Sequence, residues 1–189
     1  MKILLASQSP RRKELLQQLG FDFETVSVAC DEVFPSELPA EKVAEYLSDL
    51  KANAFGNVAK DEILITADTV VVLNHEILGK PGSFSEAKIM LKKLSRQTHQ
   101  VYTGITVKTA AETITVSDVA HVTFDFISDS ECNYYISNYE PFDKAGSYGI
   151  QDWLGMAKII KIEGSFYTVM GLPTHLLYSI LHELQNSSS

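Results

Sequence analysis

The sequence predicts an α/β fold, because strand-like and helix-like segments alternate along most of its 189 residues. Two segments carry this prediction. Residues 62–73 are the most hydrophobic stretch of the chain, as in a central strand covered on both faces. Residues 2–6 form a short apolar strand that leads directly into a helix beginning at Pro10. We therefore expect a single domain over residues 1–189, with a substantial core and with one or two lobes.

The helix after the first strand has clear boundary signals. Ser9 is a suitable N-cap, Pro10 suits the first helical position, and Gly20 favours the end of the helix. A strand that leads into a helix in this way directs the N–H groups of the first helical turn toward one point, where they can bind an anion.

The first turn of this helix carries three consecutive cations, Arg11, Arg12 and Lys13. The helix macrodipole is already positive there, so the arrangement is unfavourable unless an anion binds. A solvated basic surface is the alternative, because most charge runs have that role. Arg11 and Arg12 precede the apolar Leu15 and Leu16 at helical spacing, which places them beside the buried face and favours the anion site. Lys13 is expected to face solvent.

Residues 21–28 are expected to form a second strand, and an acidic pair, Asp31 and Glu32, follows it. Two adjacent acids after a strand form a turn or present a carboxylate to a divalent cation, and the residues alone favour the turn. A long helix begins at Pro39.

Lys51 follows Val43 and Leu47 at intervals of four residues, so it lies on the apolar stripe of the long helix. A lysine on such a stripe has two interpretations. Its stem can extend along the apolar surface to water, which is the commoner case, or its ammonium can enter a polar site.

Asp68 lies in the middle of the apolar strand 62–73. An ionised carboxylate there is costly unless it is paired, hydrogen-bonded or bound to a metal ion. Of all the acidic residues, Asp68 is therefore the one that we expect to be functional.

The rest of the chain continues the alternation of strands, helices and turns. The loop Gly79–Gly82 displays Lys80 but lacks the glycine spacing and the Ser/Thr of a Walker loop. Residues 140–151, which include Lys144 and Gln151, are rich in charge and glycine, as in a functional loop. The other expected elements are helices over 84–94, over 129–138 and from Pro173, strands over 99–108, 113–126 and 157–162, a turn or short helix over 164–171, and a frayed tail over 186–189.

The composition excludes several classes of protein. A hydrophobic content of 45% is incompatible with global disorder, and a net charge of −8 argues against a nucleic acid polymer or an anionic membrane as partner. The two cysteines, Cys30 and Cys132, match no metal or disulfide spacing. No segment is long and apolar enough for a membrane span or a signal peptide, so we expect a cytoplasmic location.

Six polar residues have no simple structural explanation, and together they comprise five cations and one carboxylate. Cations spread over phosphate oxygens, with an acid that binds a divalent metal or activates water, suit a polyphosphate substrate. The six are Arg11, Arg12, Lys51, Asp68, Lys80 and Lys144.

The sequence resembles the Maf family, nucleoside triphosphate pyrophosphatases first associated with bacterial septum formation. The resemblance covers nearly the whole chain, and its motifs occur in the family's order. They are LASQSPRRKELL at 5–16, KA at 51–52, ADT at 67–69, LGKP at 78–81, KLS at 93–95, DKAGSYGIQ at 143–151 and MGLP at 170–173.

The resemblance implies hydrolysis of a nucleoside triphosphate between its α- and β-phosphates, with Mg²⁺ or Mn²⁺ as cofactor. It implies that Asp68 is the catalytic acidic residue that activates water and lies near the metal, with Glu32 as a second carboxylate on the side of the metal. The substrate-binding residues that it implies are Ser7, Arg11, Arg12, Lys51, Thr69, Lys80, Lys144 and Gln151.

The combination of Thr69 and Gln151 is like that of the family branch acting on dTTP and UTP in a house-cleaning role. The branch acting on 7-methyl-GTP differs after the aspartate and lacks the Gly-Ile-Gln pattern. A glutamine amide offers a donor and an acceptor to a pyrimidine edge. The chain departs from the family's usual pattern at Thr66, where glycine is usual, and at Asp152-Trp153, where small residues are usual.

The resemblance also implies an elongated mixed sheet flanked by helices in two lobes with a central cleft, similar to inosine triphosphate pyrophosphatase, and a homodimer. Two other functions stay open. One is a 7-methyl-GTP pyrophosphatase, and the other is a nucleotide-binding regulator of septum formation that need not turn over its ligand.

Overall fold

The computed structural model describes residues 1–186, and it contains a seven-stranded mixed sheet flanked by helices, which confirms the predicted α/β class. The strand order is β2-β1-β3-β5-β6-β7, and β4 pairs with β3. The strands are β1 (Lys2–Leu5), β2 (Phe23–Thr25), β3 (Glu62–Leu73), β4 (Glu76–Leu78), β5 (Thr98–Lys108), β6 (Thr113–Phe124) and β7 (Ile159–Glu163). The helices are α1 (Pro10–Gln18), α2 (Ala40–Phe55), α3 (Phe84–Leu94), α4 (Asp129–Tyr139), α5 (Trp153–Lys158), α6 (Phe166–Met170) and α7 (Thr174–Asn186), with 3-10 turns η1 (Pro141–Asp143) and η2 (Ala145–Ser147).

β3 is an interior strand of the sheet, with β1 on one side and β5 on the other. β1 runs parallel to both β2 and β3, so that Ile3 lies beside Phe23 on one side and Ile63 on the other. β3 then turns back into β4 through Asn74 and His75, whose φ angles of 50° and 67° match the tight turns of hairpins.

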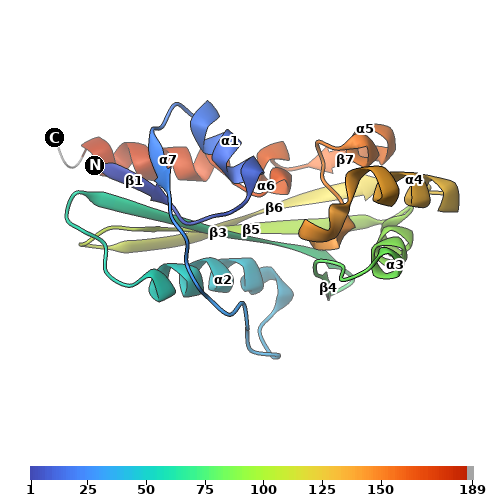
Figure 1. Ribbon diagram of the computed structural model, residues 1–189, viewed down its shortest axis with the longest axis horizontal. Coiled ribbons are helices and arrows are strands. Elements are labelled where there is room, and N and C mark those ends of the chain that lie inside the picture. The colour runs from blue at the N-terminus through green and yellow to red at the C-terminus, as the bar shows by residue number, and fades with distance from the viewer. Residues whose placement is uncertain (187–189) are drawn as a thin grey trace. The chain divides into compact units, whose positions relative to one another are not determined.

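The chain divides into two compact units. Unit 1 contains residues 1–68, 103–118 and 171–186, and unit 2 contains residues 69–102 and 119–170. In unit 1, α1 and α7 cover one face of the sheet and α2 covers the other (Figure 1). Each unit has its own hydrophobic cluster, as domains built from packed layers do. The single domain expected over residues 1–189 stays a prediction.

β3 has the predicted bounds, and its side chains are buried along almost its whole length. Two other segments differ from expectation. β2 is shorter than the predicted strand over 21–28, because only Phe23–Thr25 pairs with β1. The segment before β7 is the helix α5, which was not predicted because six residues are too few to show a helical period.

The ends of two helices differ by one residue from the predicted positions. Pro39 is the N-cap of α2 rather than its first residue, and Asn186 ends α7. Residues 187–189 of the predicted tail lie outside the described residues. Within residues 1–186, no helix combines the length and hydropathy needed to cross a membrane.

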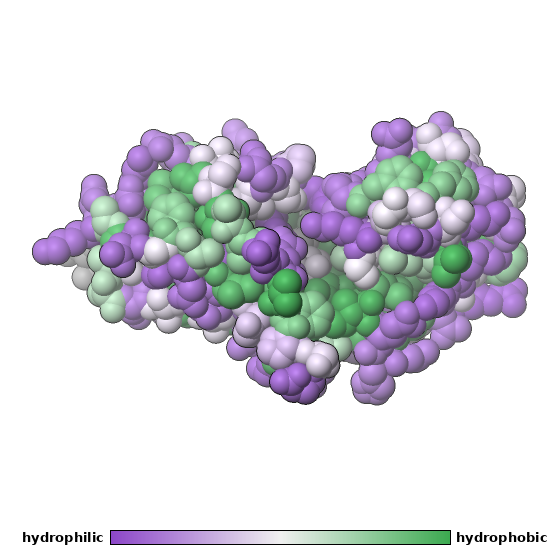
Figure 2. Space-filling model, turned by 60° about the horizontal axis from the view of Figure 1, so that its bottom comes forward, coloured by the Kyte–Doolittle hydropathy of each residue, from purple (hydrophilic) through white to green (hydrophobic). Residues whose placement is uncertain are grey.

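The surface is mixed in character. On the face shown in Figure 2, hydrophobic residues reach the surface among hydrophilic ones. The most exposed large apolar side chains include those of Val33, Met156 and Ile160. Scattered apolar side chains are normal on protein surfaces, so they do not by themselves indicate a binding site.

Candidate active site

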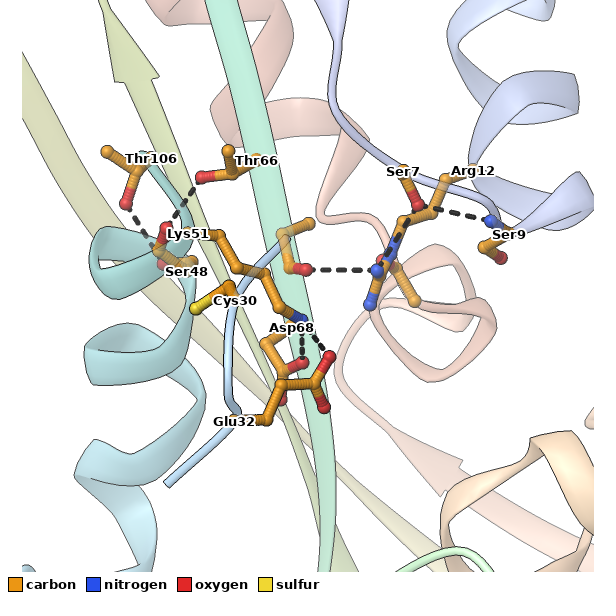
Figure 3. A network of polar contacts seen from close by, with 12 residues as sticks. Ser7, Ser9, Arg12, Cys30, Glu32, Ser48, Lys51, Thr66, Asp68 and Thr106 are labelled. Atoms are coloured by element: carbon orange, nitrogen blue, oxygen red, sulfur yellow. Dashed lines mark hydrogen bonds and ion pairs between the residues drawn. The ribbon is translucent and has the colours of Figure 1, made fainter. Parts of the chain in front are cut away.

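Three charged side chains from three segments of unit 1 converge at one point. Lys51 of α2 directs its ammonium at Asp68 of β3, with Nζ 2.5 Å from Oδ1, and at Glu32 of the loop before α2, with Nζ 2.9 Å from Oε1 (Figure 3). The Lys51 and Asp68 side chains are mostly buried, at 14% and 11% exposed, whereas Glu32 is 46% exposed. The ammonium of Lys51 is therefore bound by carboxylates.

A hydroxyl network fixes α2 against the strands beside it. The Thr66 hydroxyl donates to the Ser48 carbonyl at 2.6 Å, and the Ser48 hydroxyl lies 3.0 Å from that of Thr106 (Figure 3). Thr66 precedes Asp68 by two residues on the strand, and Ser48 precedes Lys51 by three on the helix, so each pair shares a face. The network therefore holds Lys51 and Asp68 at ion-pair distance.

The loop between β1 and α1 places Ser7 and Arg12 together. The Ser7 hydroxyl accepts from the Ser9 N–H at 3.2 Å and from Arg12 Nη1 at 3.5 Å. Arg12 also donates to two backbone carbonyls, from Nη1 to Ala67 at 2.9 Å and from Nε to Gly171 at 2.8 Å. The guanidinium is thus bound to the residue that directly precedes Asp68.

The electrostatic environment of Arg12 reflects this position. Burial lowers the pKa of Arg12, the nearby Arg11 lowers it further, and the carboxylates of Asp68 and Glu32 act in the opposite direction. The first turn of α1 contains no acidic residue. Ser9 is the N-cap as predicted, but its side chain makes no capping hydrogen bond in α1. These observations agree with the predicted surplus of positive charge at the start of α1.

The other four candidate residues belong to unit 2. Thr69 is half-buried in β3, directly after Asp68, and Lys80 is exposed in the loop before α3. The Lys144 ammonium lies 2.8 Å from Asp143 Oδ1, and Gln151 is exposed in a turn before α5. The assignment of these residues to a substrate site stays a prediction.

The described residues offer limited ligands for a metal ion. Within residues 1–186, no group of three or more His, Cys, Asp or Glu side chains is placed to hold one. Glu32 and Asp68 nevertheless direct oxygens at the same cation, the Lys51 ammonium. Because Mg²⁺ is commonly held by one or two carboxylates together with substrate phosphates and water, this carboxylate pair fits a divalent cation.

Sequence reasoning missed Tyr135, which is fully buried in α4 and whose hydroxyl donates to Asp152 Oδ2 at 2.8 Å. It also gave no role to Thr66 and Ser48. Their contacts join residues far apart in the chain, so local periodicity could not predict them. The one available signal was that Thr66 and Asp152 are unusual beside presumed site residues.

Residues 2–184 match a family model described as Maf-like protein. Curated relatives named dTTP/UTP pyrophosphatase include one from Flavobacterium psychrophilum, 48% identical over 95% of this chain and 93% of the relative. Another, from Porphyromonas gingivalis, is 49% identical over 99% of this chain and 96% of the relative. Among solved structures, the Staphylococcus aureus Ham1 protein matches with a TM-score of 0.46 and 15% identity, over 66% of this chain and 72% of that one.

Proposed function

Since the chain belongs to the family of Maf-like proteins, we propose that it hydrolyses dTTP and UTP to the monophosphate and pyrophosphate. Relatives that are 43–49% identical over most of the chain carry the name dTTP/UTP pyrophosphatase. The observation that carries the proposal is the buried carboxylate of Asp68, held beside Lys51, Glu32 and the Arg12 guanidinium. Such a set combines an acid–base group with cations for a polyphosphate.

In this proposal Asp68 accepts a proton from a water molecule whose oxygen attacks the α-phosphorus. The new phosphorus–oxygen bond forms as the bond from the α-phosphorus to the bridging oxygen breaks, and pyrophosphate leaves with that oxygen. Cations near the phosphates stabilise the charge that develops on the leaving group. Ser7, Arg11, Arg12, Lys51, Lys80 and Lys144 are the proposed phosphate-binding residues.

Recognition of the base is proposed for Thr69 and Gln151. An amide side chain offers both a donor and an acceptor, which a pyrimidine edge can pair with at once. Gln151 is exposed, so its amide is accessible to a ligand.

Asp68 and Glu32 would hold the divalent cation, which we propose is Mg²⁺ or Mn²⁺. A bound divalent cation supplies positive charge to the phosphate oxygens. Lys51 contacts the same two carboxylates, so a cation and Lys51 would share their oxygens. The cytoplasmic location and the homodimer remain part of the proposal, and sedimentation of the purified protein tests the second.

The experiment is a panel of nucleotides compared by kcat/KM, with separate assays for pyrophosphate and orthophosphate. We expect dTTP and UTP to have the highest kcat/KM values of the panel and pyrophosphate to be the product. A preference for 7-methyl-GTP would instead identify the other branch of the family. Tight triphosphate binding without turnover would identify a nucleotide-responsive regulator.

Asp68→Asn tests the role of the carboxylate. We expect a loss of about 10²- to 10⁴-fold in kcat, the range typical of a general base, with an unchanged circular dichroism spectrum. Asp61→Asn, at an exposed position just before β3, is the matched control and should be fully active. Full activity of Asp68→Asn would contradict the proposed mechanism.

A further inference from the structure

A four-residue turn presents Gln151. The Gly149 carbonyl accepts a hydrogen bond from the Asp152 N–H at 3.1 Å, so Ile150 and Gln151 are the central residues of this turn. Ile150 is buried in the core of unit 2, whereas Gln151 is exposed. The turn therefore anchors itself through one central residue and displays the amide of the next.

Both ends of the turn are bound to one buried hydroxyl. Tyr135 donates to Asp152 Oδ2 at 2.8 Å and accepts from the Gly149 N–H at 3.0 Å. The Tyr135 side chain is fully buried, and burial raises its pKa, so the phenol keeps its proton at neutral pH. One α4 side chain thus joins the first residue of the turn to the last.

The packing around the turn leaves little room for another shape. A Cβ at Gly149 would lie 2.6 Å from Asp152 Oδ2, so the carboxylate approaches closely only because residue 149 is glycine. A Cβ at Gly155 in α5 would lie 1.9 Å from the Ile150 carbonyl oxygen. The turn is therefore held by α4 through a hydroxyl and by α5 through close backbone packing.

Asp152 also connects the turn to a second proposed substrate-binding residue. The Lys144 ammonium lies 3.9 Å from Asp152 Oδ2 and 2.8 Å from Asp143 Oδ1, and its side chain is only 12% exposed. A single carboxylate oxygen of Asp152 thus contacts the Tyr135 hydroxyl and lies near the Lys144 cation.

We propose that Tyr135 and Asp152 are positioning residues that fix the Gln151 turn, and that this fixed turn makes the protein select pyrimidine over purine triphosphates. The inference rests on the proposed function, because it assigns substrate selection to the same site. A fixed backbone at Gln151 limits the positions from which its side-chain amide can offer a donor and an acceptor, whereas a loosely held backbone lets the amide reach other base edges.

Two variants remove the contact and one preserves it. Tyr135→Phe removes the hydroxyl, and Asp152→Ala removes its acceptor. Asp152→Asn keeps an oxygen acceptor but loses the charge. Tyr139→Phe is the matched control, because Tyr139 lies on the same helix, stacks on the Tyr135 ring and is exposed.

The kinetic readout separates positioning from chemistry. For Tyr135→Phe and Asp152→Ala we expect KM for UTP and dTTP to rise about tenfold, as when a buried hydrogen bond is lost, with kcat within about twofold. The ratio of kcat/KM for UTP over GTP should fall by about the same factor. Asp152→Asn should retain most of the selectivity, and Tyr139→Phe should match the unmodified protein.

Trp153 gives a readout that does not depend on activity. It is the one tryptophan of the chain, it directly follows Asp152, and its ring lies 4.9 Å from that of Tyr134. Loosening of the turn should increase the quenching of Trp153 fluorescence by acrylamide in Tyr135→Phe and Asp152→Ala. The quenching should not change in Asp152→Asn or Tyr139→Phe.

Unchanged quenching and an unchanged UTP-to-GTP ratio in Tyr135→Phe and Asp152→Ala would overturn the proposal. A fall in kcat at constant KM would also overturn it, because the pair would then act in the chemical step. If the unmodified protein hydrolyses no nucleotide, the proposed hydrolytic function fails, but selection by the turn can still be tested by binding. Equilibrium titration with the α,β-imido analogues of UTP and GTP is that test. Selection by the turn predicts that the unmodified protein binds the UTP analogue more tightly than the GTP analogue, and that Tyr135→Phe reduces this preference. Equal binding of both analogues by the unmodified protein would overturn selection.

Discussion

The ammonium of Lys51 lies between the carboxylates of Asp68 and Glu32, and this position has an energetic consequence. Two carboxylates near one point repel each other, and a mostly buried one is poorly solvated. Lys51 offsets both effects, because its ammonium lies within ion-pair distance of both carboxylates. A substrate phosphate would attract the same ammonium, so binding of a triphosphate and release of the carboxylates are expected to be coupled.

Replacement of Lys51 by glutamine tests this coupling at the level of one residue. We expect Lys51→Gln to lower the free energy of unfolding by about 2 kcal/mol, because Asp68 loses its charge partner. Added Mn²⁺ should raise the melting temperature of this variant more than that of the unmodified protein, since the ammonium no longer occupies the carboxylate oxygens. Differential scanning fluorimetry with and without Mn²⁺ measures both effects.

Lys42→Gln, at an exposed position on the same helix, is the control and should behave like the unmodified protein in both measurements. If Mn²⁺ stabilises Lys51→Gln no more than the unmodified protein, Lys51 does not share the carboxylates with a divalent cation.

The candidate residues differ in how far the sequence alone could predict their positions. Asp68 was recognisable because a charge within an apolar strand needs a partner, and Lys51 because its helical spacing places it on the inner face of α2. The Tyr135 contact could not be predicted, because a tyrosine on an apolar helix face has many possible hydroxyl partners. Only tertiary packing selects Asp152 among them.

At the level of elements, the start of α4 combines a local signal with a long-range contact. Ser128 and Glu131 form a capping box, in which the Glu131 N–H donates to Ser128 Oγ and the Ser128 N–H donates to Glu131 Oε2. The other oxygen of Glu131, Oε1, lies 2.6 Å from the ammonium of Lys158 in α5. The cap therefore also joins α4 to α5, the helix that follows the Gln151 turn.

The ion pair at this cap makes stability depend on pH. The Lys158 ammonium and the Ser128 N–H lower the pKa of Glu131 from 4.5 to about 2. The stabilisation is therefore fully present above about pH 4.5 and is lost as the pH falls from there to about 2. We expect Glu131→Gln to be less stable than the unmodified protein at pH 7, with a difference that shrinks below pH 4.5.

Urea unfolding of both proteins at a series of pH values measures this difference. Glu112→Gln, at an exposed position before β6, is the control and should show a small, nearly constant difference. A difference for Glu131→Gln that is as large at pH 3 as at pH 7 would contradict the ion pair as its source.

Most elements were predictable because their signals are local. β3 is a mostly apolar run, α4 begins with a capping box, and the β3–β4 turn has two residues that tolerate positive φ. The short α5 gave no such signal. The position of α5 depends on Gly155, which lets the helix pack on the Ile150 backbone. A sequence pattern does not predict a contact of this kind.

At the level of the whole molecule, two groups whose lowered pKa values make the fold less stable in acid, His99 and Glu131, both lie in unit 2. Burial lowers the pKa of His99 from 6.5 to about 3, and His99 packs against Phe124 and Tyr148 in unit 2. Its Nε2 lies 2.7 Å from the Tyr148 hydroxyl, whereas its Nδ1 has no hydrogen-bond partner among the described residues. The core of unit 2 therefore favours the neutral imidazole, and Glu131 lies in the same unit.

The sign of the pH effect follows from these shifts. Unfolded His99 binds a proton below about pH 6.5 while the folded form does so only near pH 3, so acid favours unfolding across that interval. The depressed pKa of Glu131 adds to this effect below about pH 4.5. We therefore expect hydrogen-exchange protection factors, corrected for intrinsic rates, to fall more in unit 2 than in unit 1 between pH 7 and pH 4. Mass spectrometry of peptides from each unit measures them.

His99→Gln separates the imidazole from other acid effects, because glutamine can hydrogen-bond the Tyr148 hydroxyl but does not titrate. This variant should be less protected than the unmodified protein at pH 7, since its side chain fills the core less well, yet should lose less protection in unit 2 on acidification. Equal loss of protection in both units would mean that they unfold as one cooperative structure. The buried histidine would then lower the acid stability of the entire fold.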